Sequence, residues 1–184
     1  LARETVQDPR GTARRLMDLQ LPEAAGPVAL GLMAVLSALL SSLALRMTPI
    51  EAEPVLQELF SSPLRMVLVQ GVALLVTVMM VHGVGRIFGG KGQLVDAVLL
   101  IAWIEVVLLL VQTAQIVLLL IAPPLSDLAG VVAIVLFFWL LSNFIAELHG
   151  FRSALMVLFC MFGTVLAVSL ALAIVAVYVV GVGV

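Results

Sequence analysis

The sequence predicts an all-α, polytopic integral membrane protein: a bundle of five transmembrane helices preceded by a short amphipathic helix. Hydrophobic residues make up 64% of the chain and charged residues 11%, and the mean hydropathy of +1.29 lies far above that of globular domains. The apolar residues gather into continuous runs, each able to cross most or all of the roughly 30 Å hydrocarbon layer as a helix. Barrel strands would alternate polar and apolar residues instead. The runs span residues 27–45, 64–84, 98–121, 128–145 and 154–180.

The N-terminal segment, residues 1–26, precedes a membrane domain that takes up residues 27–184. Asp8 and Pro9 have the chemistry of a helix N-cap followed by a first-turn proline. The helix that they begin carries an apolar stripe made of Ala13, Leu16, Met17 and Leu21. Because arginines occupy other faces of this helix, we expect it to lie on the cytoplasmic membrane surface, attracted to anionic lipid.

Helix-start and helix-stop residues separate the runs. Residues with N-cap chemistry precede the second, fourth and fifth runs: Ser62 before Pro63, Ser126 before Asp127, and Ser153. Residues expected to end helices follow the last four runs: Gly85, the pair Pro123 and Pro124, Gly150 and Gly181.

The polar stretch between the first two runs has a helix pattern of its own. Residues 48–51, Thr-Pro-Ile-Glu, have the spacing of a capping box. An apolar stripe follows at Val55, Leu56, Leu59 and Phe60. We expect this segment to lie along the membrane surface on the side opposite the N-terminus.

The distribution of basic residues predicts the orientation of the chain. With five spans, the N-terminal segment and the second and fourth loops lie on one side of the membrane. That side carries Arg3, Arg10, Arg14, Arg15, Arg86, Lys91 and Arg152, whereas the other side has only Arg46 and Arg65. Because basic residues concentrate in cytoplasmic loops, we expect a cytoplasmic N-terminus and a C-terminus on the far side.

Polar residues within the spans form a stripe around Glu105, the only acidic residue well inside a run. A charged group at the bilayer centre costs about 2.5 to 3.5 kcal/mol on insertion scales, so this side chain is expected to face the bundle, with Ser37 or Thr164 as its partner. The stripe consists of Gln70, Glu105, Gln112, Gln115 and Thr164. It is either a proton or solute path or a set of interhelical hydrogen bonds, and the lack of a second ionisable group favours the structural interpretation.

Small residues recur at four-residue spacing on two of the runs, where they allow helices to approach closely. They are Ala34, Ala38 and Ser42 in the first run and Gly163, Ala167 and Ala171 in the fifth. We expect close packing of these two runs, or of two protomers.

The sequence lacks the residue patterns of an enzyme: no nucleotide loop, no paired catalytic carboxylates, no HExxH and no serine with its base. His82 and His149 both fall near the cytoplasmic side, without further ligands at metal spacing. The prediction is a non-enzymatic protein with no metal and no cofactor, for which nucleic acid is not an expected partner.

Three short motifs carry a resemblance to a known family. Residues 88–92 read Phe-Gly-Gly-Lys-Gly, residues 139–141 Trp-Leu-Leu, and residues 147–152 Glu-Leu-His-Gly-Phe-Arg. The first resembles the "GGkG" turn of the YIP family, the Ypt/Rab-interacting-protein-like membrane proteins. The other two are similar to the end of the fourth span and the following loop in bacterial members. The resemblance covers about residues 9–180 and implies five spans with a cytoplasmic N-terminus.

The resemblance implies a membrane role rather than a reaction. Eukaryotic members act in vesicle trafficking at the endoplasmic reticulum and Golgi, with GTPase partners engaged through longer N-terminal regions than the short segment of this chain, so trafficking does not transfer. We expect a multi-pass protein of the bacterial inner membrane with a periplasmic C-terminus.

The expected function is that of a membrane scaffold or accessory subunit that binds membrane lipids, another integral membrane protein or a second copy of the chain. The alternative is a small transporter or channel that uses the stripe around Glu105. The expected partner or lipid face consists of Arg14, Arg15, Arg86, Gly89, Gly90, Lys91, His149 and Arg152.

Overall fold

The computed structural model describes residues 2–47 and 62–181, and these residues form helices and loops without a strand. The helices are α1 (Ala2–Gln7), α2 (Pro9–Asp18), α3 (Ala25–Met47), α5 (Pro63–Ile87), α6 (Leu94–Ile121), α7 (Pro123–His149) and α8 (Ala154–Gly181). Five of them, α3 and α5 to α8, are long and apolar enough to cross a membrane, and each contains one predicted run. The predicted all-α, polytopic membrane class is confirmed. The segment predicted to lie along the membrane surface, residues 48–60, falls outside the described residues.

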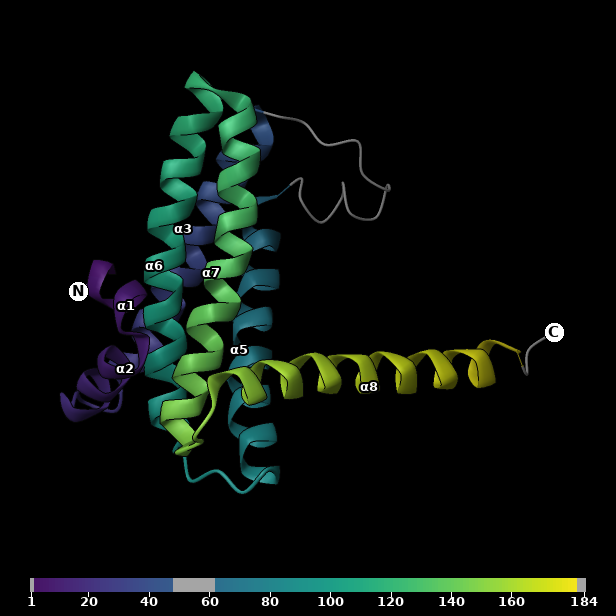
Figure 1. Ribbon diagram of the computed structural model, residues 1–184. Helices are drawn as coiled ribbons and strands as arrows, with labels where there is room; N and C mark the ends of the chain where they lie inside the picture. The colour runs from purple at the N-terminus through teal and green to yellow at the C-terminus, as the bar shows by residue number, and fades with distance from the viewer. Residues whose placement is uncertain (1, 48–61, 182–184) are drawn as a thin grey trace.

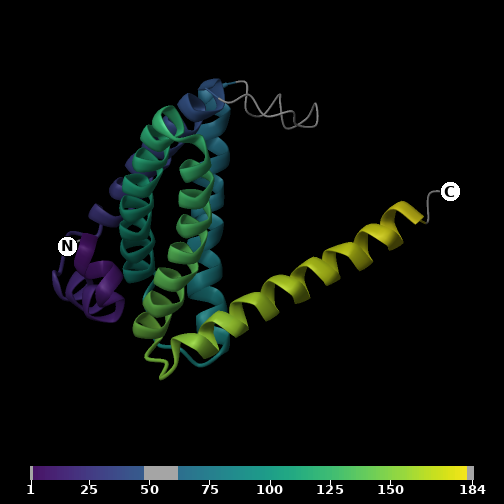
Figure 2. The same ribbon diagram turned by 45° about the horizontal axis from the view of Figure 1, so that its top comes forward.

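Four of the long helices, α3, α5, α6 and α7, run side by side as a bundle (Figure 1). The most extensive contacts join α3 to α6, α6 to α7 and α3 to α5. The fifth, α8, meets α7 near its own N-terminal end and then extends away from the bundle, as both views show (Figures 1 and 2). The fifth long helix therefore lies outside the four-helix bundle.

The core is densest in the half of the bundle to which α2 docks. The most completely buried large side chains are Leu100 and Ile104 of α6 and Leu140 and Phe144 of α7, each at most 1% exposed. We call this end of the molecule the basic end and define it by α1, α2 and the loops at 88–93 and 150–153. The opposite end is the far end.

Several predicted helix boundaries are confirmed by the backbone. Asp8 Oδ1 accepts a hydrogen bond from the backbone N–H three residues later at 2.9 Å, and Ser153 Oγ does the same at 3.2 Å, so both residues cap helices. Pro63 is the first residue of α5. Gly150 ends α7 in the left-handed conformation, with φ at +73°.

Two predicted boundaries are wrong. Gly85 lies inside α5, which continues to a cap at Phe88. The proline pair starts α7 at Pro123 instead of only ending α6, so residues 126–127 lie in the first turns of α7. A proline suits this position because first-turn N–H groups have no partner within the helix. Ala122 alone, with φ at −151°, reverses the chain between the two helices.

The small residues of the first span face helices other than the predicted one. Ala34 and Ala38 are buried and Ser42 is half-buried on α3, which packs against α5 and α6. On α8, the small residues are exposed: Gly163, Ala167 and Ala171. Packing of this second set against another copy of the chain stays a prediction.

The predicted amphipathic helix is α2, and its apolar stripe meets protein. Ala13 is 0% exposed and Leu16 is 7% exposed, and α2 packs against α6 and α7. Leu21, the last residue of the predicted stripe, is exposed. The preceding helix α1 is also tied to the bundle, because the Trp103 indole N–H donates to Thr5 Oγ1 at 3.0 Å. The apolar face of the N-terminal segment is therefore used within the fold.

Candidate functional site

A buried imidazole organises the basic end. The side chain of His149, 4% exposed, lies at the end of α7. Its Nδ1 accepts a hydrogen bond from the Gly92 backbone N–H at 3.2 Å, and its Nε2 lies 3.1 Å from the Val81 carbonyl oxygen. Because an accepting Nδ1 carries no proton, the proton sits on Nε2 and is donated to Val81. His149 is therefore a neutral ring held by backbone groups of α5 and of the loop at 88–93.

Glycines make room for this ring, and we call the space that Gly85, Gly90 and Gly92 leave for it the His149 socket. A Cβ added at Gly85 or Gly90 would overlap ring atoms of His149, and one added at Gly92 would lie 2.6 Å from Leu148 Cγ. Gly89 has open space around it but adopts φ +84°, a conformation that favours glycine. The Phe-Gly-Gly-Lys-Gly turn thus needs its glycines for two reasons: the conformation of Gly89, and the space that Gly90 and Gly92 leave for the His149 and Leu148 side chains.

The N-terminal helix fastens the same region from outside. Arg10 donates to the backbone carbonyls of Phe151 and Arg152 at 3.2 and 3.3 Å. Arg14 forms an ion pair with Glu147, with nitrogen–oxygen distances of 2.7 and 2.8 Å. This carboxylate raises the pKa of the Arg14 guanidinium above its ordinary value, so Arg14 stays charged. The Phe151 ring, in turn, stacks on His149 with centroids 5.6 Å apart.

Of the predicted partner face, some residues hold the fold and others are exposed. Arg14 and Arg15 are paired with Glu147 and Glu4, and His149 is buried with Gly90 beside it. Two apolar residues that were not part of the predicted face, Ile87 and Phe88, are 82% and 57% exposed at the end of α5. We define the loop surface as the exposed residues Arg86, Ile87, Phe88, Lys91 and Arg152. In the sequence, this surface could have been recognised from the apolar pair Ile87 and Phe88, which directly follows Arg86, the last basic residue of the second span.

Three residues of the predicted polar stripe meet at the far end. Gln70, Gln112 and Gln115 line a cavity of about 670 Å³ between α3, α5, α6 and α7. The Gln112 side-chain amide donates to Ser41 Oγ at 2.8 Å. Ser126 Oγ donates to the backbone carbonyl of Gln115 at 3.2 Å.

The other two stripe residues lie elsewhere. Glu105 is deeper in α6, 8% exposed, with a side-chain hydrogen bond to Ser37. Thr164 is on α8 and donates to the carbonyl of Cys160 at 2.8 Å, so the structure does not bring it to the stripe.

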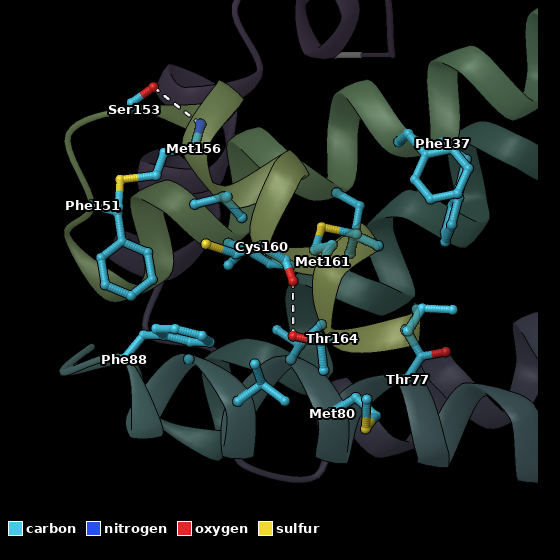
Figure 3. A pocket seen from close by; sticks show the side chains of 18 of the residues that line it. Thr77, Met80, Phe88, Phe137, Phe151, Ser153, Met156, Cys160, Met161 and Thr164 are labelled. Atoms are coloured by element: carbon cyan, nitrogen blue, oxygen red, sulfur yellow. Dashed lines mark hydrogen bonds between the residues drawn. The ribbon is translucent and has the colours of Figure 1, made fainter. Parts of the chain in front are cut away.

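A second hollow, which we call the groove, lies between α5, α7 and α8 (Figure 3). Its volume is about 450 Å³, and apolar side chains line most of it. Phe88 and Phe151 stand at one end and Thr77 and Phe137 at the other. The groove therefore begins beside the loop surface and runs between the spans.

His149 is not available as a metal ligand in this arrangement, because one ring nitrogen accepts from Gly92 and the other donates to Val81. Within residues 2–47 and 62–181, no group of three histidine, cysteine or acidic side chains is placed to hold a metal ion.

Comparison with known proteins places the whole chain in one family. The sequence matches the Yip1 domain over residues 3–182, which is nearly its full length. Neither the comparison with curated proteins nor the comparison with solved structures gave a match. The match covers all the described spans, the glycine turn and the His149 socket, and the chain therefore belongs to the Yip1 domain family of membrane proteins.

Proposed function

We propose that this protein is a non-enzymatic membrane scaffold or accessory subunit, and that the loop surface is where it binds another integral membrane protein at the cytoplasmic face. The observation that carries the proposal is the way the fold presents Ile87 and Phe88. They stand exposed at the basic end, between the basic residues Arg86 and Lys91, while the backbone beside them is fixed to the bundle core.

The rigidity of the loop supports a binding role. The Gly90 N–H donates to the Gly85 carbonyl at 2.9 Å, the Gly89 N–H donates to the Arg86 carbonyl at 3.0 Å, and Gly92 is held by His149. Binding to an ordered loop avoids the entropic cost of immobilising it in the complex. The glycine turn therefore keeps the exposed residues in a fixed position.

The chemistry of the loop surface suggests what the partner offers. Aromatic and arginine side chains contribute most of the binding free energy in many interfaces. The charges of Arg86, Lys91 and Arg152 would attract an acidic segment beside a partner's span and would also attract anionic headgroups. A partner that contacts Phe88 as well as the charges gains apolar burial that lipid headgroups alone do not provide.

Affinity purification in mild detergent with mass spectrometry tests the proposal. The wild-type chain is expected to retain a membrane protein that is lost when Phe88→Ser is combined with Arg86→Ala and Lys91→Ala. Arg46→Ala with Leu68→Ser, which changes exposed residues of α3 and α5 outside the basic end, serves as the matched control and should retain it. Equal retention by both variants would contradict the proposal.

The far-end cavity favours a second candidate, a small transporter or channel. Its lining of Gln70, Gln112 and Gln115 is suited to a polar solute. Toward the basic end, however, α6 is tightly packed, because Leu100, Ile101 and Ile104 are at most 3% exposed. Flux measured in proteoliposomes decides between the two: flux that Glu105→Gln abolishes would support transport, and we expect none.

A further inference from the structure

The groove between α5, α7 and α8 is about as deep as one leaflet of a bilayer. Along α5 its lining runs from Phe88 to Val76, which corresponds to about 18 Å of helix. One leaflet contributes about 15 Å to the hydrocarbon thickness of a membrane. A single acyl chain that begins at the basic end would therefore lie along the whole groove.

The interior of the groove presents hydrocarbon and almost no free polar groups. Its two threonine hydroxyls are turned back to their own helices: Thr77 donates to the Ala73 carbonyl at 2.9 Å, and Thr164 donates to the Cys160 carbonyl at 2.8 Å. Phe137 and Phe138 pack edge to face, with centroids 5.3 Å apart, at the deep end. A polar solute would find little to bind here, whereas an acyl chain needs no polar partner.

The mouth of the groove has the opposite character. Arg152 and Ser153 lie there beside Phe88 and Phe151 (Figure 3 labels the latter three). The Arg152 side chain is exposed, and its backbone is held by the hydrogen bond from Arg10 to its carbonyl. The helix α8 begins two residues later. Ser153 Oγ caps the Met156 N–H, and the N–H groups of Ala154 and Leu155 have no partner within the helix. This combination of a guanidinium and a helix N-terminus attracts a phosphate group.

From these observations we propose that the groove is a binding site for one anionic glycerophospholipid. One acyl chain lies between α5 and α8, and the phosphate lies at Arg152. The inference goes beyond the proposed function, because it names a class of lipid and the site that binds it. The divergence of α8 from the bundle leaves the groove open on its lipid side, so a lipid can enter from the bilayer without leaving it.

Native mass spectrometry of the full chain tests the site. The chain is released from nanodiscs that contain phosphatidylglycerol and phosphatidylethanolamine in equal amounts. The wild-type chain is expected to retain one phosphatidylglycerol in preference to phosphatidylethanolamine. Arg152→Gln should lower this retention about tenfold, since a charge-assisted hydrogen bond is lost. Arg152→Lys should restore most of it, and Arg46→Gln, a charge change at the far end of α3, should have no effect.

A second pair of variants tests the apolar part. Cys160→Trp fills the groove from α8 and should abolish retention of phosphatidylglycerol, whereas Leu155→Trp, at an exposed position of the same helix outside the lining, should not. If Cys160→Trp does not fold, Thr164→Trp one turn further along fills the same space. Unchanged retention in the groove-filling variant would overturn the site. Loss in that variant with unchanged retention in Arg152→Gln would overturn the assignment of the phosphate to Arg152.

The failure of this inference and the failure of the proposed function are distinguishable. Cys160→Trp fills the groove from α8 and replaces no residue of the loop surface, so it should lose the lipid and still retain the protein partner. A chain that retains the partner and shows no preferred lipid would refute the lipid site alone. A chain with the lipid site intact whose co-purified proteins do not depend on Phe88 and Arg86 would refute the scaffold proposal alone.

Discussion

At the scale of single residues, the imidazole of His149 joins segments that are far apart in the chain. It binds the backbone of Gly92 and Val81, and Phe151 covers one face of it. Both ring nitrogens are used in a buried site, so losing the ring would leave the Gly92 N–H without its partner. The positions of the loop surface therefore depend on this one side chain.

The steric role of the glycines gives the first prediction. Gly85→Ala should destabilise the fold by about 1 to 3 kcal/mol, because its Cβ overlaps the His149 ring. Gly83→Ala, two residues earlier on α5, has no atom within 4 Å of the added Cβ and should be neutral or slightly stabilising. Denaturation by SDS in mixed micelles measures both free energies of unfolding.

The double variant identifies the cause. In a His149→Ala background the ring is gone, so Gly85→Ala should cost less than half of what it costs in the wild-type chain. If Gly85→Ala is as harmless as Gly83→Ala, or if its cost is unchanged without the ring, the socket has been misassigned.

A second prediction concerns Glu105, which is buried beside Ser37. Glu105→Gln keeps a group that can accept a hydrogen bond and should be nearly neutral for folding. Glu105→Leu removes the acceptor and should destabilise the fold by about 1 kcal/mol. The same micelle denaturation compares them, and an equal effect of the two substitutions would show that the hydrogen bond is unimportant.

At this scale, the sequence predicts some of the residue positions and not others. Gln112 and Gln115 follow from helical spacing, because residues on one helix keep their relative positions. Thr164 has a suitable depth, but depth along a span does not say which helices are neighbours, and α8 stands apart. From the sequence alone, His149 was grouped with the predicted partner face, whereas the structure buries its side chain. Its role as the centre of a socket depends on a hydrogen bond to Gly92 across 57 residues, and no local pattern encodes that.

At the scale of elements, the spans were predictable because length and hydropathy are local properties. The turn between α6 and α7 was not, since a proline pair is compatible with both the end of one helix and the start of the next. The apolar stripe of α2 was found in part, since Ala13 and Leu16 are buried and Leu21 lies beyond the helix and is exposed. Its pattern does not distinguish lipid from protein as the surface that it covers. In the structure that surface is formed by α6 and α7.

Docking of α2 on the bundle gives the third prediction. Leu16→Ala truncates a side chain that is only 7% exposed in that contact. Because truncating a buried leucine costs about 2 to 5 kcal/mol, the rate at which the N-terminal segment opens and exchanges should rise about tenfold or more. Leu19→Ala, at a 58% exposed position, is the control and should change little. Amide hydrogen exchange of residues 9–18 in detergent reports the opening. Equal protection in the two variants would show that the packing of Leu16 does not hold α2 on the bundle.

At the scale of the whole molecule, three distant segments meet at one end of the bundle. Arg10 and Arg14 of α2 contact the loop at 150–153 and the end of α7, while the loop at 88–93 contacts His149. This meeting matches what five spans require, since the N-terminal segment and the second and fourth loops must share one side of the membrane. From the basic residues on these segments, we predict that the shared side is the cytoplasm.

The fourth prediction is therefore that Lys91 faces the cytoplasm and Asp127 faces the opposite side. In a chain whose single cysteine is replaced through Cys160→Ser, Lys91→Cys should react with a membrane-impermeant maleimide only after the cells are opened, and Asp127→Cys should react in intact cells. Both positions are exposed, so the membrane decides the outcome rather than burial within the protein. Because Lys91 and His149 belong to the same socket region, labelling of Lys91→Cys in intact cells would place the entire basic end outside. In that case the loop surface could not meet a cytoplasmic partner, and the scaffold proposal would have to be redrawn for the far face.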